Sequence, residues 1–354
     1  MKKFLAGTAA IILVLLFVGC GKTASGDGGG GGGGGSGGGN YTPTIILAKI
    51  SGVPGSYIPI KSDGAAGDPI IIPASGNIVA SSIPVFYTDT TYWYMAKDDD
   101  GNVYRQWAGA LSSQTQNLLR DSSNYVYWDN WFNTVIDNKV SVGIEHDFLV
   151  QGKNGNFAVF FNFQPVDIDN FEAADWHSDG RLFYIDKTDR KIKSIDVATG
   201  TVAPYTSSDG FSFNNNNSKI AISPDGTKAA YTRQFGITLE SEINNSSWTW
   251  LAGKGMTYQP THVFWLDNDT ALMIGKDDDN TGEILRTLTI TGSHRILPNS
   301  TLTGGTYQNV AYSGTDQKIY YLHPDGLIHY YSLENNTDHI FSNVANIEGF
   351  ALRK

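Results

Sequence analysis

Short apolar runs separated by turn residues fill the chain from about residue 44 to its end. Some runs, such as 191–196, alternate apolar and polar side chains, and this period of two indicates β-strands with one exposed face. Other runs, such as 183–185 and 272–274, are apolar at consecutive positions, which is typical of strands that are covered on both faces. The pattern predicts an all-β protein built from short strands.

A weak motif organises these strands into repeats. Each copy has an aromatic or aliphatic residue, then an Asp or Asn near a turn, and then a dense apolar strand. Clear copies begin at Phe86, Trp176, Ile222, Trp265 and Tyr312, a poorer copy begins at Trp128, and a truncated copy lies near Phe350. The copies lie roughly 38–48 residues apart, and a period in the low-to-mid forties with four short strands per repeat is typical of a β-propeller.

The spacing within each copy predicts where its later strands lie. We expect third strands at 102–107, 191–196, 236–240, 284–289 and 327–331, and short fourth strands at 116–119, 201–205, 247–251, 294–297 and 338–341. Several third strands alternate in polarity, so we expect them to be half-exposed. The segment 120–170 fits the repeat worst, although its run 156–162 is strand-like.

The two ends of the chain together supply one more repeat. The chain ends one strand into a new unit, at 347–352, and its strand-like runs 44–48, 56–60 and 69–73 follow the N-terminal segment. Pairing of the last strand with the first three would remove an open sheet edge. The sequence thus predicts, over residues 41–354, a seven-bladed β-propeller of four-stranded antiparallel blades, closed by pairing of the N- and C-terminal strands.

The acidic residues of the repeats lie in turns. In Ser223-Pro224-Asp225-Gly226 the Pro fixes φ and the Gly permits a positive φ, while the Asp can accept backbone N–H groups of its own turn. Asp179 keeps this position, Asp89 and Asn268 hold it in other copies, and Asp316 comes one residue later. We therefore expect these Asp residues to cap turns rather than to perform catalysis.

The run 221–231 (Ala-Ile-Ser-Pro-Asp-Gly-Thr-Lys-Ala-Ala-Tyr) resembles the repeat of TolB-type, WD40-like (PD40) propellers, and the copy at Trp176 is similar. The resemblance covers roughly residues 80–354 and implies a fold rather than a function. A true WD40 repeat carries Gly-His early and Trp-Asp late, whereas Trp128-Asp129 falls at a first-strand position. TolB-type proteins also carry an α/β domain before the propeller, and residues 41–80 are too few to form one.

The first forty residues have a different character. After Lys2 and Lys3, an apolar run ends at Gly19-Cys20, and the segment 17–20 resembles the lipobox of bacterial lipoproteins, with Phe in place of the usual Leu. The resemblance implies that 1–19 is a signal peptide and that Cys20, the only cysteine, is acylated; an ordinary secretory signal is the alternative. Gly21 in place of Asp favours the outer membrane, on its periplasmic or surface face. Residues 20–40, with eight consecutive glycines, predict a flexible tether.

The charge of the chain argues against two classes of anionic partner. The net charge is −10, and it becomes −12 when the two lysines of the leader are removed. This balance argues against nucleic acid and against direct adhesion to anionic lipid. Contact with a membrane is therefore expected only through the lipid anchor.

The sequence contains no catalytic motif, and no cofactor is predicted. None of the seven histidines (146, 177, 262, 294, 323, 329 and 339) is spaced from another by three or four residues, the usual spacing of metal ligands. Two acidic turns, at 98–100 and 277–280, each connect a second strand to a third. Asp277, Asp279 and Thr281 half-match a calcium loop, but no Glu follows at the required distance.

The second-to-third turns and the links between blades are expected at one rim. This rim would present the acidic and aromatic residues Asp98, Asp99, Asp100, Phe171, Tyr258 and Tyr307. Binding residues concentrate on such loops because a rigid scaffold presents them. The function predicted is that of an envelope lipoprotein whose propeller is a non-enzymatic scaffold for an envelope protein or polysaccharide. The alternatives are a lyase or hydrolase acting on sugars or peptides at the channel mouth, which would need clustered histidines and carboxylates, and a component of a TolB-like complex.

Overall fold

A computed structural model describes part of the chain. The described residues are 43–72, 76–86, 91–100, 103–111, 118–120, 140–142, 148–151, 157–161, 164–166, 171–177, 179–186, 188–189, 191–196, 199, 201–205, 219–233, 236–241, 246–251, 259–276, 282–303 and 305–353. They all belong to one compact unit, Thr42–Lys354. Every regular element among them is a strand, and they include no helix that could span a membrane.

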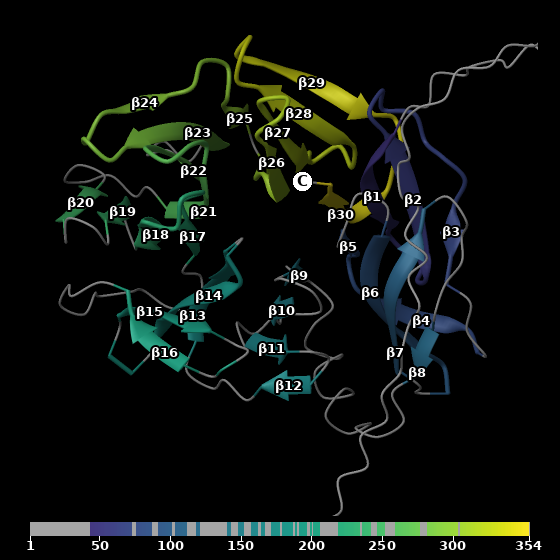
Figure 1. Cartoon of the computed structure of the whole chain (residues 1–354). Coiled ribbons are helices and arrows are strands. Elements are labelled where there is room, and N and C mark those ends of the chain that lie inside the picture. The colour runs from purple at the N-terminus through teal and green to yellow at the C-terminus, as the bar shows by residue number, and fades with distance from the viewer. Residues whose placement is uncertain are drawn as a thin grey trace, which may run out of the picture. The chain divides into compact units, whose positions relative to one another are not determined.

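The described strands form seven antiparallel sheets, and a path of four strands runs through each sheet (Figure 1). From first to fourth strand, the sheet that joins the two chain ends contains β30 (Ile347–Leu352), β1 (Thr44–Ile50), β2 (Ser56–Lys61) and β3 (Ile70–Ile71). The next three sheets along the chain contain, in the same order, β4 (Ile78–Ser81), β6 (Thr91–Asp98), β7 (Val103–Ala110) and β8 (Leu118–Arg120); β9 (Val140–Val142), β10 (Phe148–Gln151), β11 (Phe157–Phe161) and β12 (Gln164–Val166); and β13 (Phe171–Trp176), β14 (Arg181–Asp186), β15 (Ile192–Asp196) and β16 (Thr201–Pro204). The last three contain β17 (Ile220–Ile222), β18 (Lys228–Arg233), β19 (Gly236–Ser241) and β20 (Ser246–Leu251); β21 (Gln259–Trp265), β22 (Thr270–Lys276), β23 (Gly282–Thr289) and β24 (His294–Ile296); and β26 (Gln308–Ser313), β27 (Lys318–Leu322), β28 (Ile328–Ser332) and β29 (Thr337–Ser342). Two short strands lie off these paths, since β5 (Val85–Phe86) pairs with β6 and β25 (Leu302–Thr303) pairs with β23. The fold is all-β and propeller-like, with four-stranded blades.

Neighbouring sheets meet mainly through their first strands. β13 contacts β17, β17 contacts β21, and β26 contacts β30, while β5 contacts both β30 and β9. In Figure 1 the first strands β13, β17, β21, β26 and β30 lie inward of the fourth strands of their sheets. The fourth strands β16 and β24 are accordingly exposed along their whole length.

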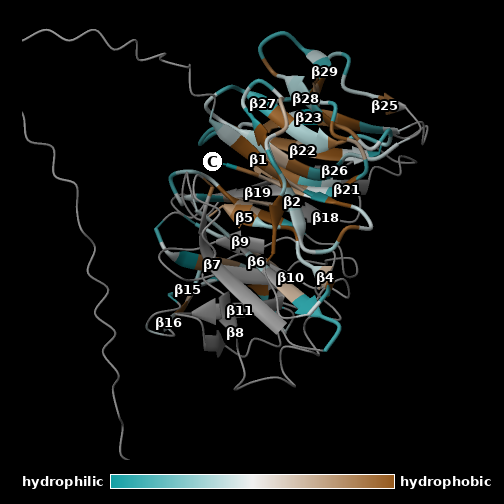
Figure 2. Ribbon diagram, turned by 90° about the vertical axis from the view of Figure 1, so that its right-hand side faces the viewer, coloured by the Kyte–Doolittle hydropathy of each residue, from teal (hydrophilic) through white to brown (hydrophobic). Residues whose placement is uncertain are grey.

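Apolar side chains fill the space between consecutive sheets. In Figure 2 the hydrophobic residues, coloured brown, lie on strands in the interior. One cluster joins β14 to β17 and β18 and includes Phe183, Tyr205 and Tyr231. Another joins β22 and β23 to β27 and includes Leu272 and Tyr321. A blade that packs on both sides must be apolar on both faces, which explains the second strands: β22 is buried at five consecutive positions.

The predicted pairing of the chain ends is confirmed. β30 pairs antiparallel with β1, and Ala48 lies opposite Phe350 in the register. Phe350 is 3% exposed and packs in a cluster that also contains residues of β26–β29. The ammonium group of Lys49 lies 2.8 Å from a carboxylate oxygen of Glu348 across the same pair of strands. The last strand of the chain therefore belongs to the same sheet as the first three strands.

The prediction that Asp residues cap the turns is confirmed for Asp179 and Asp225, whereas Asp89 lies outside the described residues. Asp179 accepts the backbone N–H of Arg181 at 3.0 Å, and Asp225 accepts that of Thr227 at 3.0 Å. Gly226 has φ +72°, a conformation in which a side chain would be strained. The assignment of Asn268 was wrong, because Asp267 accepts the N–H groups of its turn.

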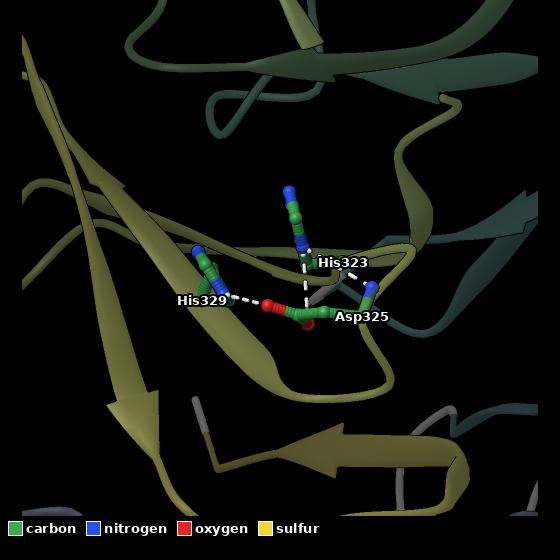
Figure 3. Close-up of side chains that lie close together, drawn as sticks. All are labelled: His323, Asp325 and His329. Atoms are coloured by element: carbon green, nitrogen blue, oxygen red, sulfur yellow. Dashed lines mark hydrogen bonds and ion pairs between the residues drawn. The ribbon is translucent and has the colours of Figure 1, made fainter. Parts of the chain in front are cut away.

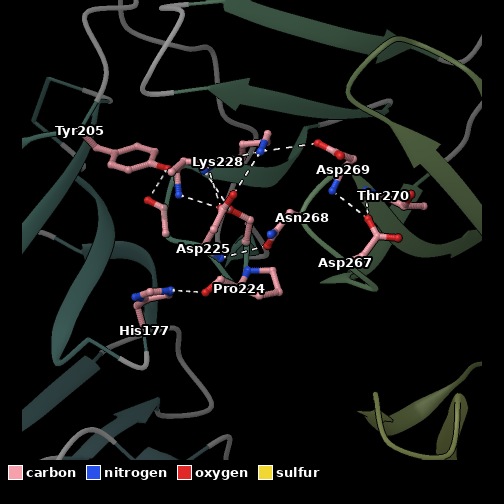
Figure 4. A network of polar contacts seen from close by, with 12 residues as sticks. His177, Tyr205, Pro224, Asp225, Lys228, Asp267, Asn268, Asp269 and Thr270 are labelled. Atoms are coloured by element: carbon pink, nitrogen blue, oxygen red, sulfur yellow. Dashed lines mark hydrogen bonds and ion pairs between the residues drawn. The ribbon is translucent and has the colours of Figure 1, made fainter.

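Asn268 instead takes part in a polar network across three sheets (Figure 4). Its Oδ1 accepts the N–H of Asp225 from the preceding sheet at 3.1 Å. One sheet earlier, Nε2 of His177 donates to the carbonyl oxygen of Pro224 at 3.1 Å. The first-to-second turns are thus linked from sheet to sheet.

The carboxylate of Asp225 is stabilised inside this network. Burial alone would raise its pKa, but hydrogen bonds from Ser223 and Thr227 and the charge of Lys228 outweigh that effect and hold the pKa of Asp225 well below its usual range. Removal of the charge should therefore weaken the turn.

The remaining strand predictions concern β23, the motif copy at Trp128 and the run at 156–162. The expectation of half-exposed third strands does not extend to β23, whose sequence does not alternate: seven consecutive residues from Gly282 are buried, because apolar clusters cover both of its faces. Trp128 and Asp129 lie outside the described residues. The strand-like run at 156–162 is confirmed as β11.

Candidate functional site

The acidic turn at 98–100 lies where β6 ends, at the sheet end where a second strand connects to a third. We call the side of the molecule that is formed by these ends of the sheets, where second strands connect to third strands, the second-turn edge. Asp98 is only 1% exposed. Asp99 is exposed, but its carboxylate accepts the backbone and side-chain N–H groups of Asn77 at 3.2 and 3.1 Å. Asp100 is exposed, so this turn offers a partner fewer free carboxylates than the sequence suggested.

The other predicted rim residues are dispersed or lie outside the description. Tyr307 is 3% exposed and donates its hydroxyl to the carbonyl oxygen of Ser300 at 2.6 Å, so its ring is not a surface aromatic. Phe171 begins β13, of which only the backbone is described at that position. Tyr258, the weak calcium candidates Asp277, Asp279 and Thr281, and the lipidation residue Cys20 lie outside the described residues.

A second turn of the same edge carries a cluster of ionisable groups (Figure 3). β27 ends at Leu322, and the turn His323-Pro324-Asp325-Gly326 leads to β28. Gly326 has φ +83°, and Asp325 accepts the backbone N–H of Leu327 at 2.9 Å. This turn chemistry fixes the carboxylate of Asp325 beside the beginning of β28.

The hairpin then returns a second histidine to the turn. His329, the second residue of β28, is 7% exposed, and its ring stacks on that of His323 with centroids 4.2 Å apart and planes at 18°. Nε2 of His329 lies 3.1 Å from Oδ2 of Asp325, and Nδ1 of His323 lies 3.0 Å from Oδ1 of Asp325. Two imidazoles therefore face one carboxylate.

A second carboxylate holds His329 from the other side. Oδ2 of Asp338, on β29, lies 3.1 Å from Nδ1 of His329. The hydroxyl of Tyr321 donates to Oδ1 of Asp338 at 2.6 Å. Burial comes first among the causes that raise the pKa of Tyr321, followed by its bond to Asp338, so the hydroxyl remains a donor.

The electrostatics of Asp325 favour its ionised form. Burial acts to raise its pKa, but hydrogen bonds from the Leu327 N–H, His323 and His329 prevail and lower it. The group of His323, Asp325 and His329 presents one ligand atom from each residue within 4.8 Å of the others. The three carboxylates at 98–100 lie equally close to one another, so both groups have donor atoms of the kind that bind metal ions.

No pair of histidines has a metal-ligand spacing in the sequence, yet His323 and His329 meet in the structure. A spacing of three or four residues describes ligands on a helix or within one loop, whereas a β-hairpin brings residues 323 and 329 together across a turn. The available signal was the His-Pro-Asp-Gly turn followed by a strand with a histidine at its second position. The similar turn at His177 is followed by β14, whose second residue is Leu182 rather than a histidine.

A buried acid lies next to the turn of another sheet. Glu283, near the start of β23, is 0% exposed, and one of its oxygens accepts the backbone N–H of Tyr307 at 2.5 Å. Burial raises the pKa of Glu283, and the N–H of Tyr307 offsets part of the increase. The residue links β23 to the segment that leads into β26.

Comparisons with known proteins identify the fold only. No protein-family model matches the sequence, and no curated protein matches it. A candidate 6-phosphogluconolactonase from Bacteroides uniformis has a similar structure, with a TM-score of 0.55 and 10% identity over 88% of this chain and 99% of that chain. A functionally unknown protein from Desulfotomaculum acetoxidans gives 0.54 and 10% over the same shares.

An oligogalacturonate lyase in complex with manganese has a TM-score of 0.53 and 11% identity over 84% of each chain. The oligogalacturonate lyase of Vibrio parahaemolyticus gives 0.51, again with 11% identity over 84% of each chain. Identities this low carry no functional assignment, because one fold hosts many unrelated activities. The likenesses support a β-propeller.

Proposed function

We propose that this chain is an envelope lipoprotein with a PD40-like, seven-bladed propeller, which acts as a non-enzymatic scaffold for a protein or polysaccharide partner. Acyl chains on Cys20 would hold it to a membrane, with the outer membrane favoured, and residues 20–40 would tether the propeller. The seven sheets would close into one circle through β30 and β1. The resemblance at 17–20 supports the anchor, and the β30–β1 pairing supports closure.

One observation carries the binding proposal: the second-turn edge presents exposed carboxylates on tightly packed sheets. Asp100 and Asp325 are both exposed, and the net charge of the chain is −10. A fixed acidic edge favours a partner with a cationic surface, because complementary charge speeds encounter and rejects other partners. The proposal includes a calcium ion at Asp277, Asp279 and Thr281, on the half-match of their sequence to a calcium loop.

The binding proposal is tested by crosslinking and affinity capture from the bacterial envelope. Replacing all three of residues 98–100 with alanine would give a result that is hard to interpret, because Asp98 is buried and Asp99 accepts a hydrogen bond from Asn77. We therefore choose Asp100→Asn, with Asp68→Asn as the matched control. Asp68 is exposed, and it lies between β2 and β3, at the opposite edge.

Capture of one specific partner by the wild type and the control, with weaker capture by Asp100→Asn, is the expected result. Equal capture by both variants would exclude Asp100 from the binding edge. The anchor is tested separately with Cys20→Ser, which should move the protein from the membrane fraction to the soluble fraction. A variant that stays in the membrane fraction would contradict lipidation of Cys20.

A sugar-degrading or peptide-degrading enzyme is the second candidate. The observation that favours it is the convergence of His323, Asp325 and His329, the kind of cluster that a propeller lyase or hydrolase would need. The similar structures include an oligogalacturonate lyase with manganese. Turnover of oligogalacturonate, lost in His329→Ala, would favour the enzyme, and no turnover of sugar or peptide libraries would favour the scaffold.

A further inference from the structure

We propose that His323, Asp325 and His329 form a binding site for one divalent first-row transition-metal cation, such as Zn²⁺, at the turn between β27 and β28. The inference does not depend on the proposed function, because the site would bind its cation with or without a partner. Geometry, hydrogen-bond capacity and a supporting shell of residues each point to it.

The ligand atoms are already close to the separation that a cation requires. Zinc bonds of about 2.0–2.2 Å in a tetrahedral arrangement place ligand atoms roughly 3.4 Å apart. Oδ2 of Asp325 lies 3.1 Å from Nε2 of His329, and Oδ1 lies 3.0 Å from Nδ1 of His323. In Figure 3 the facing nitrogen of each ring points toward the carboxylate that lies beneath them. These two distances end on different oxygens of Asp325, and one ligand atom from each of the three residues lies within 4.8 Å of the others, so rotations of the side chains would bring the three atoms around one ion.

The hydrogen-bond capacity of His329 gives an independent argument. Both of its nitrogens face carboxylate oxygens, those of Asp325 and Asp338, at 3.1 Å. Ionised carboxylates only accept hydrogen bonds, and a neutral imidazole has one N–H. If Nδ1 donates to Asp338, then Nε2 and Asp325 oppose one another with lone pairs. A cation between them would remove this mismatch, and it would replace the contact in which Nδ1 of His323 accepts the backbone N–H of Asp325 at 3.3 Å.

The surroundings resemble those of metal-bound histidines in general. Such a histidine usually donates its other N–H to a carboxylate, which fixes the tautomer and the ring orientation. Asp338 occupies this position behind His329, and Tyr321 in turn donates to Asp338 at 2.6 Å. Tyr321 is 1% exposed and packs edge-to-face on Tyr307 at 4.5 Å. The support for His329 therefore reaches into the apolar core between two sheets.

The donor set selects the class of cation. Two imidazole nitrogens favour zinc and its first-row neighbours, whereas calcium requires six or more oxygen ligands. Three protein ligands leave a fourth position for water or a partner's side chain. The side chain of Asp325 is 40% exposed, so that position opens toward solvent.

The test is a calorimetric titration of the full chain with ZnCl₂, MnCl₂ and CaCl₂ after removal of metals with a chelator. One equivalent of Zn²⁺ should bind, and the site should be lost in His323→Ala and in His329→Ala. Because His329 is buried, circular dichroism must show that its variant is folded; His323 is half-buried and serves as the second variant. Asp338→Asn should weaken binding about 10–100-fold while leaving the three ligands in place.

The chain supplies a matched control in His177. It lies in a similar turn with its Nδ1 3.1 Å from Asp179, but no second histidine returns to it, so His177→Ala should leave Zn²⁺ affinity unchanged. Bound Co²⁺ should show visible absorption that disappears in His323→Ala. Absence of stoichiometric binding, or binding that survives both His323→Ala and His329→Ala, would overturn the proposal.

Discussion

Truncation of Phe350 probes the strand that joins the end of the chain to its beginning. The side chain is 3% exposed and packs with Ile46, Tyr320 and Ile328 in the cluster that joins β30 and β1 to the sheet of β26–β29. A buried Phe removes roughly 200 Å² from water, which at about 25 cal/mol per Å² corresponds to about 5 kcal/mol. Because alanine retains part of this burial, we expect Phe350→Ala to cost about 3–5 kcal/mol.

The measurement is urea-induced unfolding followed by tryptophan fluorescence. A loss of this size is a large share of a typical stability of about 5–15 kcal/mol. Ile340→Ala is the matched control, since Ile340 lies on β29 and is 52% exposed, and it should cost about 1 kcal/mol or less. If Phe350→Ala cost no more than the control, the last strand would not be docked and the packing argument would fail.

Three further predictions concern the turn network and the contacts between sheets. Gly226→Ala should cost about 1–2 kcal/mol, because φ is +72° and a Cβ would lie 3.0 Å from His177; calorimetric melting measures it. Trp265→Phe should cost about 1–3 kcal/mol in urea unfolding, since its Nε1–H donates to the buried carbonyl of Ala221 at 2.9 Å. The pKa of Asp225 is lowered in the folded state, so its stabilisation is present above the ordinary value near 4 and is lost as the pH falls below it; Asp225→Asn should be less stable at pH 7 and should lose less stability on acidification.

Each of these predictions has a control or a contradicting outcome. Gly314→Ala should be close to neutral, since the nearest atom to its Cβ would be 3.8 Å away, and equal costs at Gly226 and Gly314 would refute the strain argument. Unchanged stability in Trp265→Phe would show that the carbonyl of Ala221 finds another donor. Parallel pH curves for Asp225→Asn and wild type would mean that the charge does not stabilise the turn.

The strand plan of the fold could be predicted because the repeat has a local cause. A turn with Asp and Gly, followed by a strand that is apolar on both faces, recurs wherever a blade packs between two others. Fourth strands at 201–204, 294–296 and 337–342 therefore lie within one or two residues of their predicted ranges. The pairing of β30 with β1 followed from counting strands at both ends of the chain.

The incorrect predictions concern contacts between residues that the spacing of residues along the sequence does not reveal. Asp98 and Tyr307 were assigned to an exposed rim because polar or aromatic loop residues are usually exposed, yet both are buried. Seven consecutive residues of β23 are buried because apolar side chains of other strands cover both of its faces. His323 and His329 meet only because the hairpin folds back, and no periodicity of three or four residues records that geometry.

An engineered disulfide between β1 and β30 tests directly whether the propeller is closed by its own chain ends. Leu47 and Ala351 are opposite each other in the register, so Leu47→Cys with Ala351→Cys, in a Cys20→Ser background, places two thiols across the pair. Peptide mapping after mild oxidation should find residues 47 and 351 linked within one chain, and no link in the control pair Leu47→Cys with Val202→Cys. Free thiols or links only between chains would show that the first and last strands do not pair.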